Sequence, residues 1–288
     1  MEISVVIPVY NTVQNLLVSL PKLIEQFKSK YNTFEIILII DNTNKVDKLE
    51  ELYLFQKEVP EISIHYLNNN YGQHFATLCG YYFAKGEHIL SVDEDMSDKI
   101  NEVIYNNTFK DYDLFYFLYD KNNMYSTGFR KICSAFFRKI LDAAFNMRKH
   151  STFRIISASL KEKLLAEKHI YWSLDIMSHR QTTKIGYTTL RTDDITDKGT
   201  SYNLFRLLNM IYEIGMEYYT FTTSIALLFL PFCLLYCFSK NMVMTLVVHI
   251  LSAMTMTVIF KFRRCQTNVT LEKILKAALS QQVCKLKS

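Results

Sequence analysis

The sequence lacks several signatures that would assign the protein to common functional classes. None of its six cysteines forms a C-x-x-C pair, so their spacing predicts buried or inert thiols of a reducing compartment rather than a zinc site. The net charge is only +5, and no interleaving of basic and aromatic residues accompanies it, which disfavours nucleic-acid binding. The sequence opens on a short β-branched run without a signal-peptide pattern, so we expect the first domain to stay in the cytoplasm.

Apolar residues make up 49% of the 288 residues, and their excess is concentrated near the C-terminus. Residues 220–238 and 242–260 are each 19 residues long and carry no formal charge. A helix of about 20 apolar residues crosses a bilayer, so the sequence predicts a transmembrane hairpin over residues 219–262, with a buried core hairpin as the alternative. Positive charge on its outer flanks predicts a multi-pass protein of the inner (cytoplasmic) membrane with both termini in the cytoplasm.

Amphipathic segments flank the predicted hairpin on both sides. Residues 202–218 predict an aromatic-rich helix at the membrane interface. The tail, residues 263–288, is basic and has an apolar helical face, which resembles an interfacial helix; an ordinary surface helix is the alternative. Residues 1–201 remain as one cytoplasmic domain, which is long enough to bury a core.

Within residues 1–201, apolar strands alternate with helices. Strands are predicted at 3–9, 34–40, 62–67, 88–92, 114–118 and 185–190, and helices near 16–27, 46–57, 73–85, 128–147, 159–168 and 173–180. The alternation predicts an α/β fold with a mainly parallel sheet and helices on both faces. Ligands bind such sheets beyond the carboxyl ends of their strands, and Asp41 and Asp93 both fall at such ends.

The triplet Asp93-Glu94-Asp95, directly after the predicted strand 88–92, is the strongest chemical signal. Two carboxylates at positions i and i+2 beyond a strand can converge on one hard cation. Asp93 and Asp95 are therefore predicted ligands of Mg²⁺ or Mn²⁺, with Asp95 as the more direct one. Because acidic clusters are common on surfaces, it is the position after a strand, with Asp41 after an earlier one, that makes this a site prediction.

Four motifs within the first 100 residues together resemble the family 2 inverting glycosyltransferases of the GT-A fold. They are Ser4–Asn11, the turn 40–43 in place of a D-D-G-S-like turn, the N-x-G-x-x-x-A-like stretch Asn70–Ala76, and Asp93–Ser97 in place of D-x-D-L-Q. The resemblance implies that residues 1–201 are a catalytic domain, with Asp93 and Asp95 as catalytic and metal-binding residues.

The same resemblance implies a nucleotide-diphosphate sugar as the donor. The residues implied to bind it are Pro8, Tyr10, Asn11, Asp41, Asn70, Gly72, Gln73 and Asp93.

A weaker resemblance extends to the subgroup of dolichyl- and polyprenyl-phosphate sugar synthases. Its R-x-x-x-S and S-x-F-R-like elements are similar to Arg130–Ser134 and Ser151–Arg154, and its R-x-x-G-x-S-K-Y segment to residues 196–202. The resemblance implies a polyprenyl-type lipid acceptor and a protein that can form a homo-oligomer. The implied acceptor- or phosphate-binding residues are Arg130, Ser134, Arg154, Lys198 and Ser201. For each arginine, a solvated charge on a helix is the alternative.

Two departures from the family pattern keep other functions open. Ile40 replaces the first aspartate of the family's D-D pair, and Thr196 stands where the subgroup has arginine. One alternative is a transferase that extends a lipid-linked saccharide in O-antigen or capsule synthesis; a hydroxyl acceptor would then need a carboxylate base, for which Asp175 is the first candidate. Another is a non-catalytic membrane scaffold of the same fold. A nucleotidyltransferase is disfavoured because the loop 8–11 is neither glycine-rich nor basic.

Overall fold

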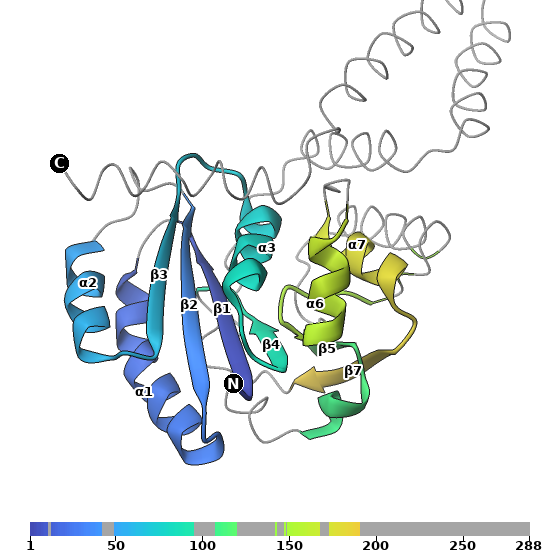
Figure 1. Ribbon diagram of the computed structural model, residues 1–288, viewed down its shortest axis with the longest axis horizontal. Helices are drawn as coiled ribbons and strands as arrows, with labels where there is room; N and C mark the ends of the chain where they lie inside the picture. The colour runs from blue at the N-terminus through green and yellow to red at the C-terminus, as the bar shows by residue number, and fades with distance from the viewer. Residues whose placement is uncertain are drawn as a thin grey trace, which may run out of the picture. The chain divides into compact units, whose positions relative to one another are not determined.

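The computed structural model describes residues 1–10, 13–41, 49–94, 107–119, 142, 147, 149–167 and 173–190. These residues form a seven-stranded sheet with the order β3-β2-β1-β4-β6-β5-β7 (Figure 1). The strands are β1 (Ile3–Val9), β2 (Phe34–Asp41), β3 (Ile62–Leu67), β4 (His88–Ser91), β5 (Leu114–Tyr119), β6 (Arg154–Ser157) and β7 (Ile185–Leu190). Four of the strand pairs are parallel, and only β6 runs antiparallel to its neighbours β4 and β5.

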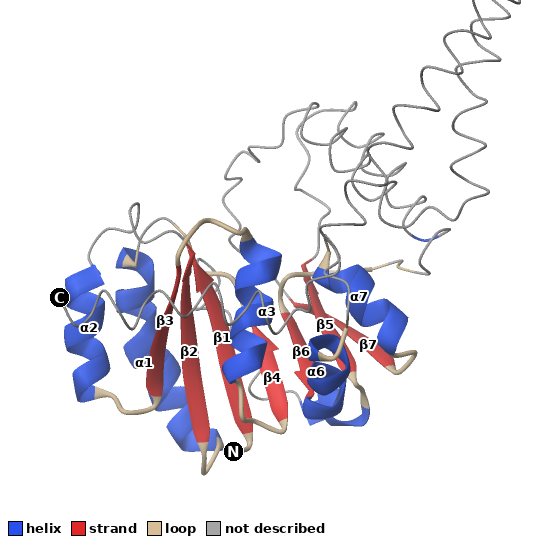
Figure 2. Ribbon diagram, turned by 45° about the horizontal axis from the view of Figure 1, so that its top comes forward, coloured by secondary structure: helices blue, strands red, loops and turns tan. Residues whose placement is uncertain are grey.

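Helices cover both faces of this sheet. They are α1 (Gln14–Lys30), α2 (Leu49–Glu58), α3 (Gln73–Phe83), α6 (Ala158–Leu165), α7 (Leu174–Gln181) and the short 3₁₀ helix η2 (Asn107–Asp111). Figure 2 shows α3 and α6 on the face of the sheet opposite α1. The predicted α/β architecture, a mainly parallel sheet with helices on both faces, is therefore confirmed for the described part of the chain.

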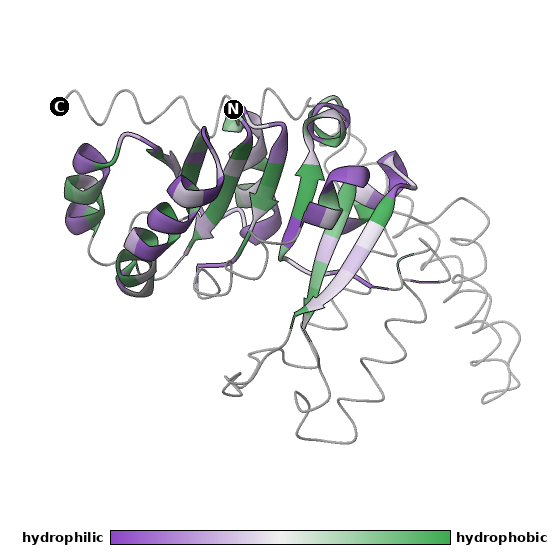
Figure 3. Cartoon of the chain, turned by 90° about the horizontal axis from the view of Figure 1, so that it is seen from below, coloured by the Kyte–Doolittle hydropathy of each residue, from purple (hydrophilic) through white to green (hydrophobic). Residues whose placement is uncertain are grey.

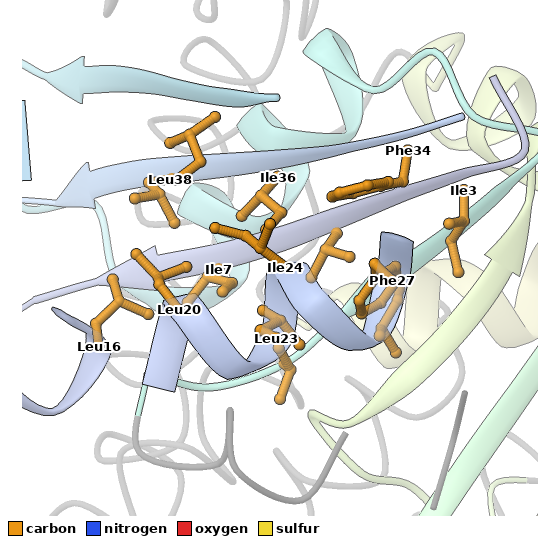
Figure 4. Close-up of a cluster of buried hydrophobic side chains, with 14 of the residues drawn as sticks. Ile3, Ile7, Leu16, Leu20, Leu23, Ile24, Phe27, Phe34, Ile36 and Leu38 are labelled. Atoms are coloured by element: carbon orange, nitrogen blue, oxygen red, sulfur yellow. The ribbon is translucent and has the colours of Figure 1, made fainter. Parts of the chain in front are cut away.

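Alternate residues of β1 pack against different helices because successive side chains of a strand point to opposite faces. Figure 4 shows Ile3 and Ile7 of β1 packed with Leu20 and Phe27 of α1, in a cluster that also takes side chains from β2. On the other face, a Cβ added to Gly80 of α3 would lie 2.1 Å from Cγ1 of Val6. Only glycine permits this close approach, which holds α3 on the sheet and its first residue at the carboxyl edge of the strands.

Hydrophobic residues are concentrated in the central strands, whereas the helices carry hydrophilic residues on their outer sides (Figure 3). Every residue of β1 is buried, and β2 is buried from Ile36 to Asp41. Each apolar side chain removed from water contributes about 1.5–3 kcal/mol. Burial on both faces explains why these strands are continuous apolar runs in the sequence.

The sequence pattern does not predict β6. The strand has only four residues, Arg154-Ile155-Ile156-Ser157, and begins with a charged side chain, so it is too short to show an apolar period. It lies between β4 and β5 and turns an otherwise parallel sheet into a mixed one.

No helix within the described ranges is long and apolar enough to cross a membrane. The segments predicted to contact or cross the bilayer, residues 202–218, 219–262 and 263–288, lie outside those ranges, as does nearly all of the predicted helix 128–147.

His65 on β3 gives a prediction about the pH dependence of stability. Its ring stacks on Phe83 of α3 with centroids 3.6 Å apart, and burial lowers the pKa of His65 from 6.5 to about 4. Between these pH values the unfolded chain binds a proton that the folded chain does not, so this contribution to stability is present above pH 6.5 and is lost as the pH falls.

We expect His65→Gln to flatten the pH dependence of the unfolding free energy between pH 6.5 and about 4. The measurement is denaturant unfolding of the full chain at stepped pH values, compared between the variant and the wild type. Equal slopes in the two proteins would show that a different group governs this range.

Candidate active site

The carboxyl ends of β1, β2 and β4 meet at one edge of the sheet, together with the loop 68–72 that leads from β3 to α3. Asp41 is the last residue of β2, and Asp93 lies two residues beyond the end of β4. The structure thus places both carboxylates where the sequence predicts them.

The Asp41 carboxylate holds the loop 70–72 in place. Its Oδ1 accepts a hydrogen bond from the backbone N–H of Tyr71 and its Oδ2 one from Gly72, each at 2.8 Å. Gly72 has a φ of +85°, which favours glycine. Burial raises the pKa of Asp41, and the two backbone hydrogen bonds oppose this shift. Because Asp41 is 2% exposed, its visible role is to shape the loop; the predicted contact with the nucleotide stays a prediction.

The Asp93 carboxylate is held by two side chains from different elements. The Gln73 Nε2 amide at the start of α3 donates to Oδ1, and the Thr152 hydroxyl donates to Oδ2 at 2.7 Å. Asp93 remains partly exposed. Gln73 and Asp93 are both predicted donor-binding residues, and the structure brings them into contact.

Tyr10, Asn70 and Glu94 form a third group at the same edge. The backbone N–H of Tyr10 donates to Glu94 Oε2 at 3.0 Å, and the Asn70 side-chain amide donates to the Tyr10 hydroxyl at 3.3 Å. The Tyr10 ring is exposed, and Pro8 lies two residues earlier, buried in β1. The ends of β1 and β4 are therefore tied to the loop after β3 by side chains of the predicted site.

Two residues after Thr152 in the chain, Arg154 takes part in a buried ion pair. Arg154 of β6 and Asp175 of α7 are 1% and 4% exposed, and the Arg154 guanidinium pairs with Asp175 Oδ1. The Tyr116 hydroxyl of β5 donates to the same oxygen at 2.8 Å. Burial favours a raised pKa for Asp175, but the Arg154 charge outweighs it and the pKa is lowered. Both groups are therefore charged, and the positive charge of Arg154 neutralises the negative charge of Asp175 in the interior.

Two histidines stand near this ion pair. Burial lowers the pKa values of His74 on α3 and His179 on α7, although the negative charge of Asp175 opposes both shifts. The His179 ring stacks on Tyr116 with centroids 5.9 Å apart. Burial thus favours the neutral imidazole at both positions.

The structure gives a clear position to Arg154 and Asp175 but does not test their predicted roles. The alternative of a solvated helix charge is wrong for Arg154, which lies buried in a strand. Its binding of acceptor phosphate and the action of Asp175 as a base stay predictions, since each side chain is occupied by the other. The remaining predicted site residues, Asn11, Asp95, Arg130, Ser134, Lys198 and Ser201, lie outside the described residues.

Carboxylate oxygens are the ligands that Mg²⁺ and Mn²⁺ prefer, and Asp93 offers them at the edge where a diphosphate would bind. Within the described part of the chain, no three His, Cys, Asp or Glu residues are grouped so that they could hold a metal ion. The predicted partner Asp95 lies outside the described residues, so the metal site stays a prediction.

Sequence reasoning missed Thr152, Ser91 and Tyr116. Thr152 and Arg154 are two residues apart, so in an extended segment they share a face. That spacing is the signal that could have placed Thr152 in the site. The hydroxyls of Ser91 and Tyr116 carry no comparable signal, because each lies within an apolar strand.

A mixed α/β sheet with carboxylates at the carboxyl edge of its parallel strands agrees with the α/β fold class that the sequence predicts. Residues 4–131 match the model of glycosyl transferase family 2. This stretch is less than half of the chain and contains all four motifs, so the resemblance to family 2 is confirmed for these residues.

Two curated relatives match a shorter stretch. The undecaprenyl-phosphate 4-deoxy-4-formamido-L-arabinose transferases of Photorhabdus laumondii and Pectobacterium atrosepticum are 34% and 35% identical over 104 residues. This alignment covers 35% of the chain and 31% of each relative, so the chain spans about a third of their length.

Among solved structures, glucosyl-3-phosphoglycerate synthase from Mycobacterium tuberculosis, crystallised with Mn²⁺, uridine diphosphate and phosphoglyceric acid, resembles the chain. The alignment has 13% identity and a TM-score of 0.45, and it covers 75% of this chain and 76% of that chain.

Proposed function

We propose that this protein is a metal-dependent inverting glycosyltransferase that moves a sugar from a nucleotide-diphosphate sugar to a polyprenyl-phosphate lipid. The observation that carries the proposal is the double hydrogen bonding of Asp93 at the carboxyl edge, beside Tyr10 and Asn70. Asp93 and Gln73 lie within the stretch that matches family 2. The relatives' names, which specify undecaprenyl phosphate, support the choice of acceptor.

The donor nucleotide would bind between the ends of β1 and β4 and the loop that Asp41 holds. Tyr10 offers an exposed aromatic ring to a base, and the Asn70 amide lies next to its hydroxyl. Pro8, Asn11, Gly72 and Gln73 complete the proposed donor site. Gly72 has no side chain, which lets the loop backbone come close to a ligand.

Asp93 and Asp95 would hold a Mg²⁺ or Mn²⁺ ion at this edge. When bound, the ion would neutralise the diphosphate and make the nucleoside diphosphate a better leaving group. The chain's own contribution is to fix Asp93 before the donor arrives, because the hydrogen bonds from Gln73 and Thr152 are already formed.

A phosphate acceptor is already anionic, so its attack on the sugar needs little help from a base. Arg130, Ser134, Lys198 and Ser201 are the proposed acceptor contacts. Arg154 is the less accessible candidate, because its guanidinium faces Asp175 in the interior. The proposed hairpin, residues 219–262, would keep the domain at the inner membrane on the cytoplasmic side, where a lipid acceptor is presented, and the protein could act as a homo-oligomer.

A second candidate is the extension of a lipid-linked saccharide, which the altered segment 196–202 favours because it lacks the subgroup's arginine. Attack by a sugar hydroxyl needs a carboxylate base. Asp175 would serve only after releasing Arg154 and Tyr116, which both occupy it.

The test is a transfer assay with the full chain in membranes or detergent. Nucleotide sugars with different bases are offered with polyprenyl phosphate, with and without Mg²⁺ or Mn²⁺. We expect a lipid-linked sugar to form with one donor and transfer to stop when EDTA removes the metal. Transfer only to a lipid-linked saccharide would select the second candidate. Absence of both transfer and metal-dependent nucleotide binding would identify a non-catalytic scaffold and reject the proposal.

A further inference from the structure

We infer that Thr152 is a positioning residue that fixes the Asp93 carboxylate in the orientation that binds the donor. The inference rests on the proposed function and extends it to a residue outside the family motif that contains Asp93.

The geometry of Asp93 shows what Thr152 contributes. Its hydroxyl donates to Oδ2 at 2.7 Å, while Gln73 donates to Oδ1 from the start of α3. An aspartate held at one oxygen only can still turn about its Cβ–Cγ bond, which has a broad torsional preference. Donors at both oxygens, from two separate elements, define the plane of the carboxylate.

Thr152 can act in this way because the segment that carries it is itself fixed. Two residues later, Arg154 pairs with Asp175 on α7, and its Nε lies 3.4 Å from the Ser91 hydroxyl. Ser91, two residues before Asp93, is also bonded to the Thr152 carbonyl at 3.4 Å. Ser91, just before Asp93, thus contacts both Thr152 and Arg154, so the distance between the Thr152 and Asp93 side chains is set by the fold.

A second threonine–carboxylate hydrogen bond provides a matched comparison. The Thr182 hydroxyl donates to Asp113 Oδ2 at 2.6 Å. Asp113 directly precedes β5 and Thr182 lies before β7, and both strands run in the direction of β4. This bond is therefore at the amino edge of the sheet, opposite the site, and its removal reports what losing such a bond does to the fold alone.

The experiment compares Thr152→Val, Thr152→Ser and Thr182→Val in the full chain. Calorimetry measures the binding of UDP, GDP, ADP and dTDP with and without Mn²⁺, and transfer assays with the active donor give kcat and KM. We expect Thr152→Val to weaken metal-dependent nucleotide binding about 10- to 100-fold, the usual effect of removing a partner that orients a ligand. Thr152→Ser keeps the hydroxyl and should bind like the wild type.

Thr182→Val should lower the unfolding midpoint yet leave nucleotide affinity unchanged. The inference is overturned if Thr152→Val binds the metal–nucleotide complex like the wild type, or if Thr152→Ser is as weak as Thr152→Val. Either result can arise while the wild type still binds nucleotide and transfers sugar, so the proposed function would stand. If the wild type itself binds none of the nucleotides, with or without Mn²⁺, the proposed function and the inference are both rejected.

Discussion

Replacement of Asp93 by asparagine is expected to lower sugar transfer by at least about 100-fold, the effect typical of losing one group that stabilises charge in the transition state. The substitution removes the negative charge. It also turns one of the two oxygens into an N–H donor, so the hydrogen bond from Gln73 is lost or the one with Thr152 is reversed. The measurement is the initial rate of transfer with the donor found in the screen, with the amount of folded, membrane-bound protein determined in parallel.

The matched control for this variant is Asp113→Asn. Asp113 also accepts hydrogen bonds from two hydroxyls, those of Thr182 and Ser157, but at the opposite edge of the sheet. Its replacement should reduce stability and leave the specific activity near that of the wild type. If Asp93→Asn transferred sugar as fast as Asp113→Asn, the proposed donor site would be wrong.

Replacement of Arg154 by methionine is expected to destabilise the fold by about 3–5 kcal/mol. Asp175 would be left charged in the interior, with the Tyr116 hydroxyl as its remaining hydrogen-bond donor among the contacts described for it. Denaturant unfolding of the full chain, followed through a signal from the sheet domain, measures the loss.

Two further variants make this result specific. The double variant Arg154→Met, Asp175→Leu removes both charges and should recover most of the lost stability, because apolar replacements of a buried pair are often neutral. Lys28→Met breaks the pair with Glu61, in which the lysine side chain is 55% exposed, and should change stability by less than about 1 kcal/mol. Equal effects of Arg154→Met and Lys28→Met would contradict the view that the buried pair holds β6.

The double variant also separates two roles of Arg154. If the arginine only stabilises the fold, the double variant should transfer sugar with an unchanged KM for polyprenyl phosphate. A stable double variant with a strongly raised KM for the lipid would instead support the predicted phosphate contact. The role of Asp175 as a base is tested with a lipid-linked saccharide as the acceptor, where an unchanged kcat in a stable double variant would argue against it.

The parts of the fold that the sequence predicts are those with local signals. β1 and β2 are mainly apolar runs because both faces of the sheet are covered there, and Asp41 and Asp93 are found by their place after predicted strands. β6 is different, since four residues that begin with a buried arginine have no period. What makes β6 a strand is its pairing with β4 and β5, which no local pattern encodes.

The site divides in the same way. Gln73, Asn70 and Tyr10 belong to motifs near their own strands and are predicted, and the structure links them to Asp93 and Glu94. Thr152 is absent from the prediction because its partner Asp93 is 59 residues away in the sequence. Arg154 is predicted as a phosphate ligand because a guanidinium suits phosphate, yet the structure gives it a carboxylate 21 residues further along the chain.

The antiparallel insertion of β6 has a consequence for the order in which the protein folds. β1 to β4 and the helices between them are synthesised first, whereas β6 enters beside β4 from a point 63 residues beyond Ser91. A nascent chain that has folded only its first four strands therefore already carries Asp93 at the sheet edge, but without the hydrogen bond from Thr152. We expect the chain to bind the donor only after β6 has been synthesised and has paired with β4. Synthesis of the second half of the domain would therefore control when the first half can bind its ligand.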